Sequence, residues 1–354
     1  MDGVDIALVE TDGASRLRFG PTGFRPYDAA DRALLRSALA AAAGLADRAA
    51  RPGLLAEAER RVTECHRLAV EDFLATHAIG RDTIDVIGFH GQTVLHRPEE
   101  KLTVQIGDGT GLARALDVPI AYDFRAADVA AGGQGAPLVP IFHRALAANA
   151  GLEGPVVVIN VGGVANLTFI DGEADPIAFD TGPGNALIDD LMLQHAGIAM
   201  DEGGATAARG KVDAVVLALL LGHPYFARRV PKSLDRGAFS AAAAQNLAVE
   251  DAAATLTAFT AHAIARAFDH LPGVPRLAVL SGGGAHNLTL RWHLMQLLPC
   301  GLVTADALGW SGDAVEAQAF AYLAVRSVKN LPITFPSTTG VEAPLVGGRI
   351  AVPA

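Results

Sequence analysis

Three glycine-rich turns stand directly after short apolar runs, and this placement constrains the fold more than any other feature of the chain. The turns read NVGGVAN at 160–166, DTGPGN at 180–185 and SGGGAHN at 281–287. The runs that precede the turns have the length and composition of buried strands. In open α/β sheets, ligands bind beyond the carboxyl ends of strands, so the pattern predicts an α/β protein with ligand-binding strand ends.

Helical periodicity alternates with these and other short strands. Apolar residues recur every three or four positions from Leu55 to Phe73, which predicts a helix with one buried face that includes Cys65. Residues 10–27 are rich in turn-forming residues, so we expect no regular element there. Helices are expected at 211–221, 240–270 and 313–329, and from about 288. Strands are expected at 4–9, 84–89, 102–106, 118–121, 155–159, 167–170, 176–179 and 277–280.

Size, charge and cysteine content limit the possible classes of function. At 354 residues the chain exceeds what one hydrophobic core usually supports, so two lobes are expected, with a boundary near 132–137. A net charge of -10 argues against a nucleic-acid partner, and two cysteines are too few for a disulfide framework or a zinc site. No apolar run has the roughly 18 residues of a membrane span, and the acidic N-terminus lacks the features of a secretory signal. We therefore expect a cytoplasmic protein with no membrane partner.

Each glycine-rich turn has both a functional and a structural interpretation. Gly162 and Gly163 could direct backbone amides at phosphate oxygens, or they could form an ordinary tight hairpin. The glycines from Gly282 to Gly284 could lie against a nucleotide base or ribose, or they could form a loose connection. Asp180 could accept a proton from an attacking hydroxyl or water, or it could cap a helix. These alternatives stay open on the residues alone.

Polar turns also follow strands in the first third of the chain. They contain His90 and Gln92, and further on Asp123 and Arg125. Their equivalent positions predict a site for one polar substrate, although His90 could be structural and Asp123 could form an ion pair with Arg125. The chain has no G-x-G-x-x-G fingerprint, and residues 204–212 lack the spacing and hydroxyl of a Walker loop. A Rossmann dehydrogenase and a P-loop kinase are therefore disfavoured.

Together these segments resemble the anhydro-N-acetylmuramic acid kinase family, within the acetate kinase, sugar kinase, Hsp70 and actin superfamily. The similar segments are GFHGQTVLHRP at 88–98, TVQIGDG at 103–109, YDFRAADVAAGGQGAPLVP at 122–140, INVGGVANLT at 159–168, FDTGPGN at 179–185, DEGG at 201–204, Lys232-Ser233 with Arg236 and Phe239, SGGGAHN at 281–287, GDAVEAQAFAYLAVR at 312–326 and PSTTG at 336–340. They cover nearly the whole chain in order.

The resemblance implies two actin-like, ribonuclease H-like lobes with ATP and Mg²⁺ in the cleft between them. The N-terminal lobe would comprise residues 1–128 and 335–354, and the C-terminal lobe residues 129–334. The substrate would be 1,6-anhydro-N-acetylmuramic acid, opened hydrolytically and phosphorylated to N-acetylmuramic acid 6-phosphate in peptidoglycan recycling and amino sugar catabolism. A homodimer is also implied.

The resemblance assigns roles residue by residue. Asp180 matches the aspartate that activates water for attack on the anomeric carbon. Residues matching the ATP-binding motifs are Asp2, Gly3, Asp5, Gly162, Gly163, Asn166, Gly282, Gly283 and Gly284. Asp2 is also expected to orient Mg²⁺. Residues expected to contact the sugar are His90, Gln92, Asp123, Arg125 and Glu316, of which Glu316 could otherwise be an exposed helix charge.

The N-terminus departs from the family pattern. The family begins with a strand and a phosphate loop, G-T-S-x-D-G-V-D, whereas this sequence begins MDGVD. We expect a start codon upstream of Met1. The alternative is a catalytically impaired homologue that only binds nucleotide or sugar, because phosphoryl transfer depends on donors around the γ-phosphate. A kinase for another sugar or a carboxylic acid, or an ATP-driven switch, would share the fold.

Overall fold

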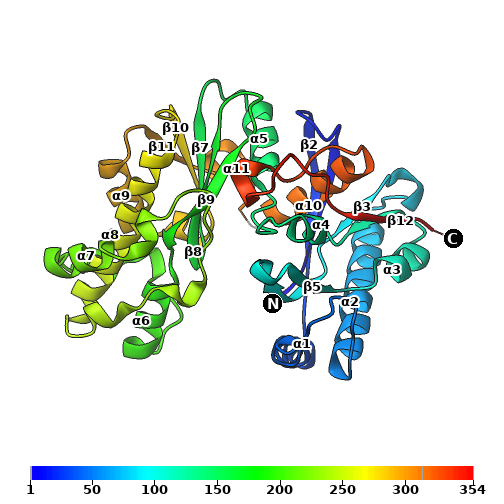
Figure 1. Cartoon of the computed structure of the whole chain (residues 1–354), viewed down its shortest axis with the longest axis horizontal. Helices are drawn as coiled ribbons and strands as arrows, with labels where there is room; N and C mark the ends of the chain where they lie inside the picture. The colour runs from blue at the N-terminus through cyan, green and yellow to red at the C-terminus, as the bar shows by residue number, and fades with distance from the viewer. Residues whose placement is uncertain (1, 313, 354) are drawn as a thin grey trace. The chain divides into compact units, whose positions relative to one another are not determined.

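The computed structural model describes residues 2–312 and 314–353, which form two compact units (Figure 1). Unit 1 contains residues 2–149 and 314–353, and unit 2 contains residues 150–312. This division differs from the lobes predicted from the sequence, with boundaries at 128/129 and 334/335. The difference arises because helices α5 (Pro140–Asn149) and α10 (Val315–Val328) pack in unit 1, against each other and against its strands.

Unit 1 combines three small groups of strands with helices. Its strands are β1 (Gly3–Thr11), β2 (Leu17–Pro26), β3 (Ile87–Phe89), β4 (Gln92–Arg97), β5 (Leu102–Ile106), β6 (Ile120–Tyr122) and β12 (Arg349–Ala351). β1 and β2 form an antiparallel hairpin, as do β4 and β5, and the third group has the order β12-β6-β3 with β3 parallel to β6. Its other helices are α1 (Ala29–Ala42), α2 (Leu54–Thr76), α3 (Gly109–Leu116), α4 (Ala126–Ala130) and α11 (Pro336–Thr339).

Helix α2 confirms the periodicity argument. Every apolar position that predicted its inner face is buried, namely Leu55, Ala58, Val62, Cys65, Ala69 and Phe73. All of these side chains except that of Phe73 join a core with residues of β4, β5 and α3. The spacing of three or four residues repeats close to the 3.6-residue turn of a helix, so all six side chains face the same side.

Unit 2 is built on one five-stranded sheet with the order β11-β10-β7-β8-β9. Its strands are β7 (Val156–Val161), β8 (Val164–Ile170), β9 (Ile177–Pro183), β10 (Leu277–Ser281) and β11 (Gly301–Thr304). β7, β10 and β11 run parallel to one another, while β8 and β9 continue as an antiparallel meander. Its helices are α6 (Ala186–Ala196), α7 (Ala214–Leu221), α8 (Val249–Ala267) and α9 (Leu288–Leu297). The predicted α/β class is confirmed.

Four strands were not predicted: β2, β4, β11 and β12. β2 contains Gly20, Pro21 and Gly23, which indicate a turn, but it pairs only with β1 and alternates between exposed and partly buried positions. Proline and glycine are tolerated in such an edge strand because a neighbouring strand does not need every backbone donor.

No helix within residues 2–312 and 314–353 has the length and apolar content of a membrane span.

Candidate functional site

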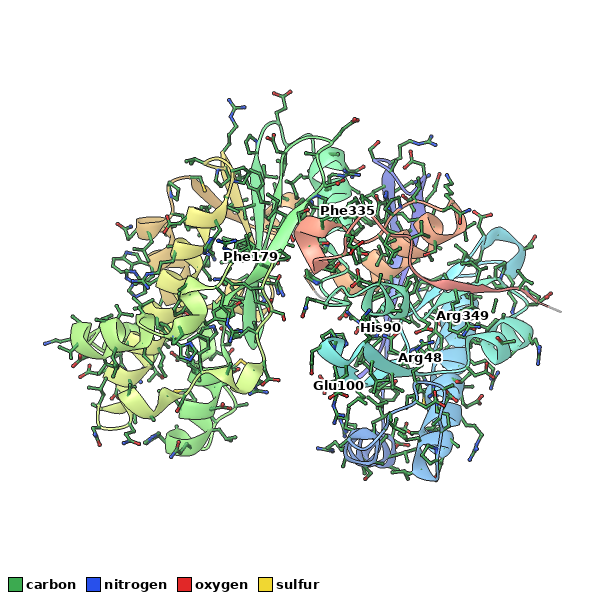
Figure 2. All side chains as sticks on the ribbon, in the orientation of Figure 1. Arg48, His90, Glu100, Phe179, Phe335 and Arg349 are labelled. Atoms are coloured by element: carbon green, nitrogen blue, oxygen red, sulfur yellow. The ribbon has the colours of Figure 1, made fainter. Side chains whose placement is uncertain are left out.

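A row of four polar side chains crosses the sheet of unit 2. Ser281 lies opposite Asn160, Asn160 opposite Asn166, and Asn166 opposite Asp180, on β10, β7, β8 and β9 respectively. Residues directly opposite each other in neighbouring strands share a face of the sheet. All four are partly exposed, whereas Phe179, which precedes Asp180, is buried in the core (Figure 2). The strand alternation therefore directs Phe179 inward and Asp180 outward.

The glycine-rich turns meet at the same end of this sheet. Gly162 and Gly163 connect β7 to β8, and the backbone N–H of Gly184, after β9, donates to Gly163 O at 2.9 Å. The N–H of Asn185 donates to Gly162 O at 2.8 Å. A Cβ placed on Gly284, after β10, would lie 2.4 Å from the Val161 side chain. Segments far apart in the sequence are therefore in direct contact here.

Three of these glycines are required by the protein's own packing. A Cβ on Gly184 would lie 2.2 Å from Gly162 O, and one on Gly282 would lie 2.5 Å from Asn160 Oδ1. Gly282 also has a φ of +76°, in the left-handed region that favours glycine. Together with the contact of Gly284 to Val161, these distances explain why no side chain is accepted at the three positions.

Gly162, Gly163 and Gly283 have no such explanation. None has a φ in the left-handed region, and a Cβ on any of them would find its nearest atom at 3.7, 3.8 or 3.6 Å, an ordinary van der Waals distance. The hairpin interpretation explains the turn at 162–163 but not its glycines, since two-residue hairpins use glycine for positive φ. A bare backbone that the fold does not need is what close approach by a ligand requires.

Asp180 is held by the segment that follows α7. Its backbone N–H donates to Lys232 O at 3.0 Å, and the Tyr225 hydroxyl donates to Asp180 O at 2.6 Å. The backbone N–H of Leu234 donates to carboxylate Oδ2 at 2.7 Å. The other oxygen, Oδ1, accepts no hydrogen bond from any residue in the described ranges. Asp180 thus has one anchored oxygen and one available oxygen.

Burial makes Asp180 a stronger base than an ordinary aspartate. Desolvation raises its pKa to about 6, and the Leu234 hydrogen bond opposes this shift without cancelling it. At neutral pH the carboxylate is still mostly ionised, but it binds a proton far more readily than an exposed one. This is the property expected of a general base that works near neutral pH.

The positively charged side chain of Arg236 lies beside Gly163, one of the three glycines that the packing does not explain. A Cβ on Gly163 would lie 3.8 Å from Cδ of Arg236, whose guanidinium forms an ion pair with Asp190 at 3.2 Å. Sequence reasoning placed Arg236 in a similar segment but not in the site, and it also omitted Asn160 and Ser281. Asn160 and Ser281 could have been identified from their positions, because each lies at the end of a strand that precedes a glycine-rich turn.

In unit 1, the structure links three of the residues expected to contact the sugar. Arg125 Nη2 donates to His90 Nε2 at 3.2 Å, and His90 Nδ1 donates to Gly91 O at 3.0 Å. Burial, reinforced by Arg125, lowers the pKa of His90 to about 4, so the imidazole is neutral. Burial also lowers the pKa of Arg125, and the carboxylate of Glu316 acts in the opposite direction.

Asp123 does not pair with Arg125, which corrects one interpretation left open by the sequence. Its carboxylate forms an ion pair with Arg48 at 2.5 Å, while Arg125 Nη1 donates to Gly135 O at 2.9 Å. Asp123 has a φ of +59°, which turns the chain immediately after β6. Gln92, on β4, donates from Nε2 to the backbone O of Thr93 at 3.1 Å.

The three N-terminal candidates lie at the start of the chain's first hairpin. Asp2 precedes β1, and Gly3 and Asp5 belong to it. Asp2 and Asp5 are exposed, whereas a Cβ on Gly3 would lie 2.3 Å from Arg25 O of the neighbouring strand. Gly3 is therefore required by strand pairing.

The fold and the site together define an α/β protein with a basic carboxylate beside glycine-rich turns at the strand ends of one sheet. The family model for anhydro-N-acetylmuramic acid kinase matches residues 1–353. Proteins named anhydro-N-acetylmuramic acid kinase are 56% identical over 354 residues in Rhodopseudomonas palustris (strain BisB18), covering 100% of this chain and 97% of that protein. The match in Methylobacterium nodulans is also 56% identical, over 363 residues, with the same coverage. The chain therefore belongs to the anhydro-N-acetylmuramic acid kinase family.

Similarity to solved structures is much weaker. Component A of (R)-2-hydroxyglutaryl-CoA dehydratase from Acidaminococcus fermentans is 11% identical, with a TM-score of 0.44 and coverage of 92% of this chain and 99% of that one. A polyphosphate/ATP-glucomannokinase from Arthrobacter sp. strain KM is 14% identical, with a TM-score of 0.42 and coverage of 90% and 93%.

Proposed function

We propose that this chain uses ATP to open 1,6-anhydro-N-acetylmuramic acid hydrolytically and to phosphorylate it to N-acetylmuramic acid 6-phosphate. One observation carries the proposal. Asp180 presents a free carboxylate oxygen, with a pKa raised to about 6, beside glycine turns whose backbone is open to a ligand. Membership of the anhydro-N-acetylmuramic acid kinase family supports this substrate and the phosphoryl transfer.

The proposed reaction assigns one base to two coupled events. Oδ1 of Asp180 takes a proton from water, and the water oxygen forms a bond to the anomeric carbon C1. The C1–O6 bond breaks, and its electron pair remains on O6, which forms the new bond to the γ-phosphorus as ADP leaves. Leu234 and Tyr225 keep the carboxylate oriented during this step.

The residues around Asp180 fit a bound nucleotide. Gly162, Gly163 and Gly283 would face phosphates and adenosine, with Gly282 and Gly284 shaping the adjacent turn. ATP supplies the phosphoryl group, and Mg²⁺ supplies charge neutralisation at the phosphates. The guanidinium of Arg236 would add a further positive charge to this surface.

The oxygen atoms that unit 2 offers as metal ligands also suit Mg²⁺. Mg²⁺ takes oxygen ligands and usually binds through one or two carboxylates together with phosphates and water. Asn166 and Asp180 offer such oxygens side by side on the sheet. Among residues 2–312 and 314–353 there is no group of three or more His, Cys, Asp or Glu side chains that could hold a metal alone. Asp2 stays our candidate metal ligand in unit 1, with Asp5 as a further nucleotide contact.

For the sugar we propose the polar groups of unit 1. The neutral His90 is fixed by Arg125, and Glu316 lies in the first turn of α10 with an exposed side chain. Gln92 and Asp123 complete the candidate set. We also propose that the protein acts in the cytoplasm as a homodimer in peptidoglycan recycling. Analytical ultracentrifugation tests the dimer, and a monomer at micromolar concentration would contradict it.

Mass spectrometry of the sugar product formed in ¹⁸O-labelled water tests the reaction. We expect one ¹⁸O atom at C1 and one phosphoryl group at O6. Asp180→Asn should abolish both, while Asp171→Asn, an exposed aspartate in the β8–β9 turn, should retain both. Retention of either event by Asp180→Asn would show that one base does not serve both. ATP binding without any sugar product would instead favour the catalytically impaired homologue.

A further inference from the structure

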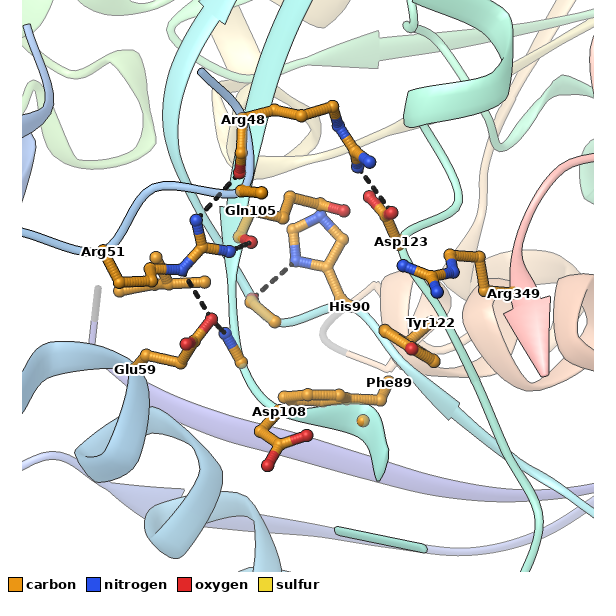
Figure 3. A pocket seen from close by; sticks show the side chains of 15 residues that line it. Arg48, Arg51, Glu59, Phe89, His90, Gln105, Asp108, Tyr122, Asp123 and Arg349 are labelled. Atoms are coloured by element: carbon orange, nitrogen blue, oxygen red, sulfur yellow. Dashed lines mark hydrogen bonds and ion pairs between the residues drawn. The ribbon is translucent and has the colours of Figure 1, made fainter. Parts of the chain in front are cut away.

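Unit 1 contains a polar pocket that extends beyond the predicted sugar contacts (Figure 3). Its volume is about 260 Å³. Drug-sized ligand sites usually occupy roughly 300–1,000 Å³, so this pocket suits a sugar substituent or a small polar molecule better than a nucleotide. It shares His90 and Asp123 with the candidate sugar site and adds Arg48, Gln105 and Arg349.

The carboxylates that line the pocket are already engaged within the protein. Glu59 pairs with Arg51 at 2.7 Å and accepts from the backbone N–H of Gly107 at 3.2 Å. Asp108 caps α3 by accepting a hydrogen bond from the backbone N–H of Gly111. The third lining carboxylate, on Asp123, pairs with Arg48. Glu59 and Asp123 are therefore each paired with an arginine, and Asp108 has one oxygen engaged at the start of α3.

Arg349 is a further cation that lines the pocket. Its guanidinium carbon lies 5.6 Å from the centroid of the Tyr122 ring, and it has no ion pair or hydrogen bond with any side chain in the described part of the chain. Stacking on an aromatic face orients the guanidinium while leaving its N–H donors free. Arg48, Arg349 and His90 occupy the same part of unit 1 (Figure 2). The pocket therefore presents a preoriented guanidinium that has no ion-pair partner among the described residues.

A second observation indicates a polar ligand. Gln105 donates from Nε2 to Thr93 Oγ1 at 3.1 Å, but its buried Oε1 accepts no hydrogen bond from the residues described. A buried polar atom without a partner costs free energy, so such atoms usually find a partner in the functional complex. A ligand with an N–H donor near its anionic group would satisfy both Gln105 and Arg349.

We propose that Arg349, stacked on Tyr122, recognises the lactyl carboxylate of the muramic acid, and that Gln105 accepts from the neighbouring acetamido N–H. The lactyl ether at C3 and the acetamido group at C2 are adjacent on this sugar, and Arg349 and Gln105 line the same pocket. This inference rests on the proposed function and deepens it. It makes Arg349 the residue that distinguishes a muramic acid from a glucosamine, which lacks the lactyl group.

Binding measured by calorimetry with two sugars tests the proposal. The sugars are 1,6-anhydro-N-acetylmuramic acid and 1,6-anhydro-N-acetylglucosamine, and the measured quantity is the ratio of their Kd values. Arg349→Met keeps an apolar stem over Tyr122 but removes the charge. Because Arg349 is exposed at a strand end, we expect the preference for the muramic acid to fall roughly tenfold. Arg60→Met, an exposed arginine of α2 outside the pocket, should keep the wild-type preference.

A second variant separates the two contacts. Gln105→Met removes the acetamido contact, which both sugars share, so both affinities should fall by similar factors while their ratio stays near the wild-type value. An unchanged ratio in Arg349→Met, or equal binding of the two sugars by the wild type, would overturn the inference.

The same measurements keep this inference distinct from the proposed function. If the wild-type protein phosphorylates the muramic acid while Arg349→Met retains full preference, only the inference fails. If the wild type binds neither sugar, both fail.

Discussion

Replacing Asp180 by Asn should stabilise unit 2 at neutral pH, because the wild-type carboxylate is ionised in a desolvated position. The pKa of Asp180 is raised from 3.8 to about 6 in the folded protein. Between these values the folded state binds more protons than the unfolded state, so stability falls as pH rises through this window and stays reduced above it. At 1.36 kcal/mol per pKa unit the full cost is about 3 kcal/mol.

Part of that cost already applies at acidic pH. By proton linkage, the raised pKa of Asp180 lowers the free energy of unfolding by about 1 kcal/mol at about pH 4.5 and by about 3 kcal/mol at about pH 7.5. The gain in unfolding free energy from Asp180→Asn should therefore be about 2 kcal/mol larger at the higher pH. Asparagine can still accept the hydrogen bond from Leu234, so the local geometry should persist.

Urea unfolding followed by tryptophan fluorescence measures this difference. Both tryptophans of the chain, Trp292 and the buried Trp310, lie in unit 2 and report on the unit that contains Asp180. Asp171→Asn serves as the control at an exposed position. A gain for Asp180→Asn that is the same at both pH values would refute the desolvation argument, and with it the assignment of a raised pKa.

Two further predictions concern the glycines and the pH dependence of catalysis. Gly163→Ala should fold with wild-type stability but bind ATP at least tenfold more weakly. Gly184→Ala should lower the midpoint of thermal unfolding, because its Cβ would lie 2.2 Å from Gly162 O. Equal stability of the two variants would contradict the packing analysis. For the reaction, kcat/KM should fall about tenfold per pH unit below about pH 6, as Asp180 becomes protonated, and a rate independent of pH down to about pH 4.5 would show that another group is the base.

Local patterns in the sequence predicted much of the secondary structure. The inner face of α2, strand β5 at 102–106 and the start of α9 at 288 lie where periodicity and turn residues placed them. These features depend on residues within a few positions of one another. β2 was missed for the same reason, since its glycines and proline resemble a turn and only its pairing with β1 makes it a strand.

The candidate site could be predicted only in part. Asp180 and the residues around it were indicated by two features of the sequence: glycine-rich turns that directly follow strands, and motifs that resemble those of the family in the same order. The ion pair between Asp123 and Arg125, considered as the alternative to a sugar contact, was a local inference, whereas the observed partner of Asp123, Arg48, lies 75 positions away. Similarly, Arg349 reaches Tyr122 only because β12 pairs with β6. Such partners depend on chain topology, which short sequence windows do not contain.

The sequence by itself determined the alternation of helices and strands, the position of the glycine turns and the family to which the chain belongs. Tertiary structure alone decided which glycines the packing requires and which it leaves open to a ligand, since that depends on atoms brought together from separate strands. It also decided the basicity of Asp180, because desolvation is a property of the folded surroundings and not of the residue or its neighbours in the chain.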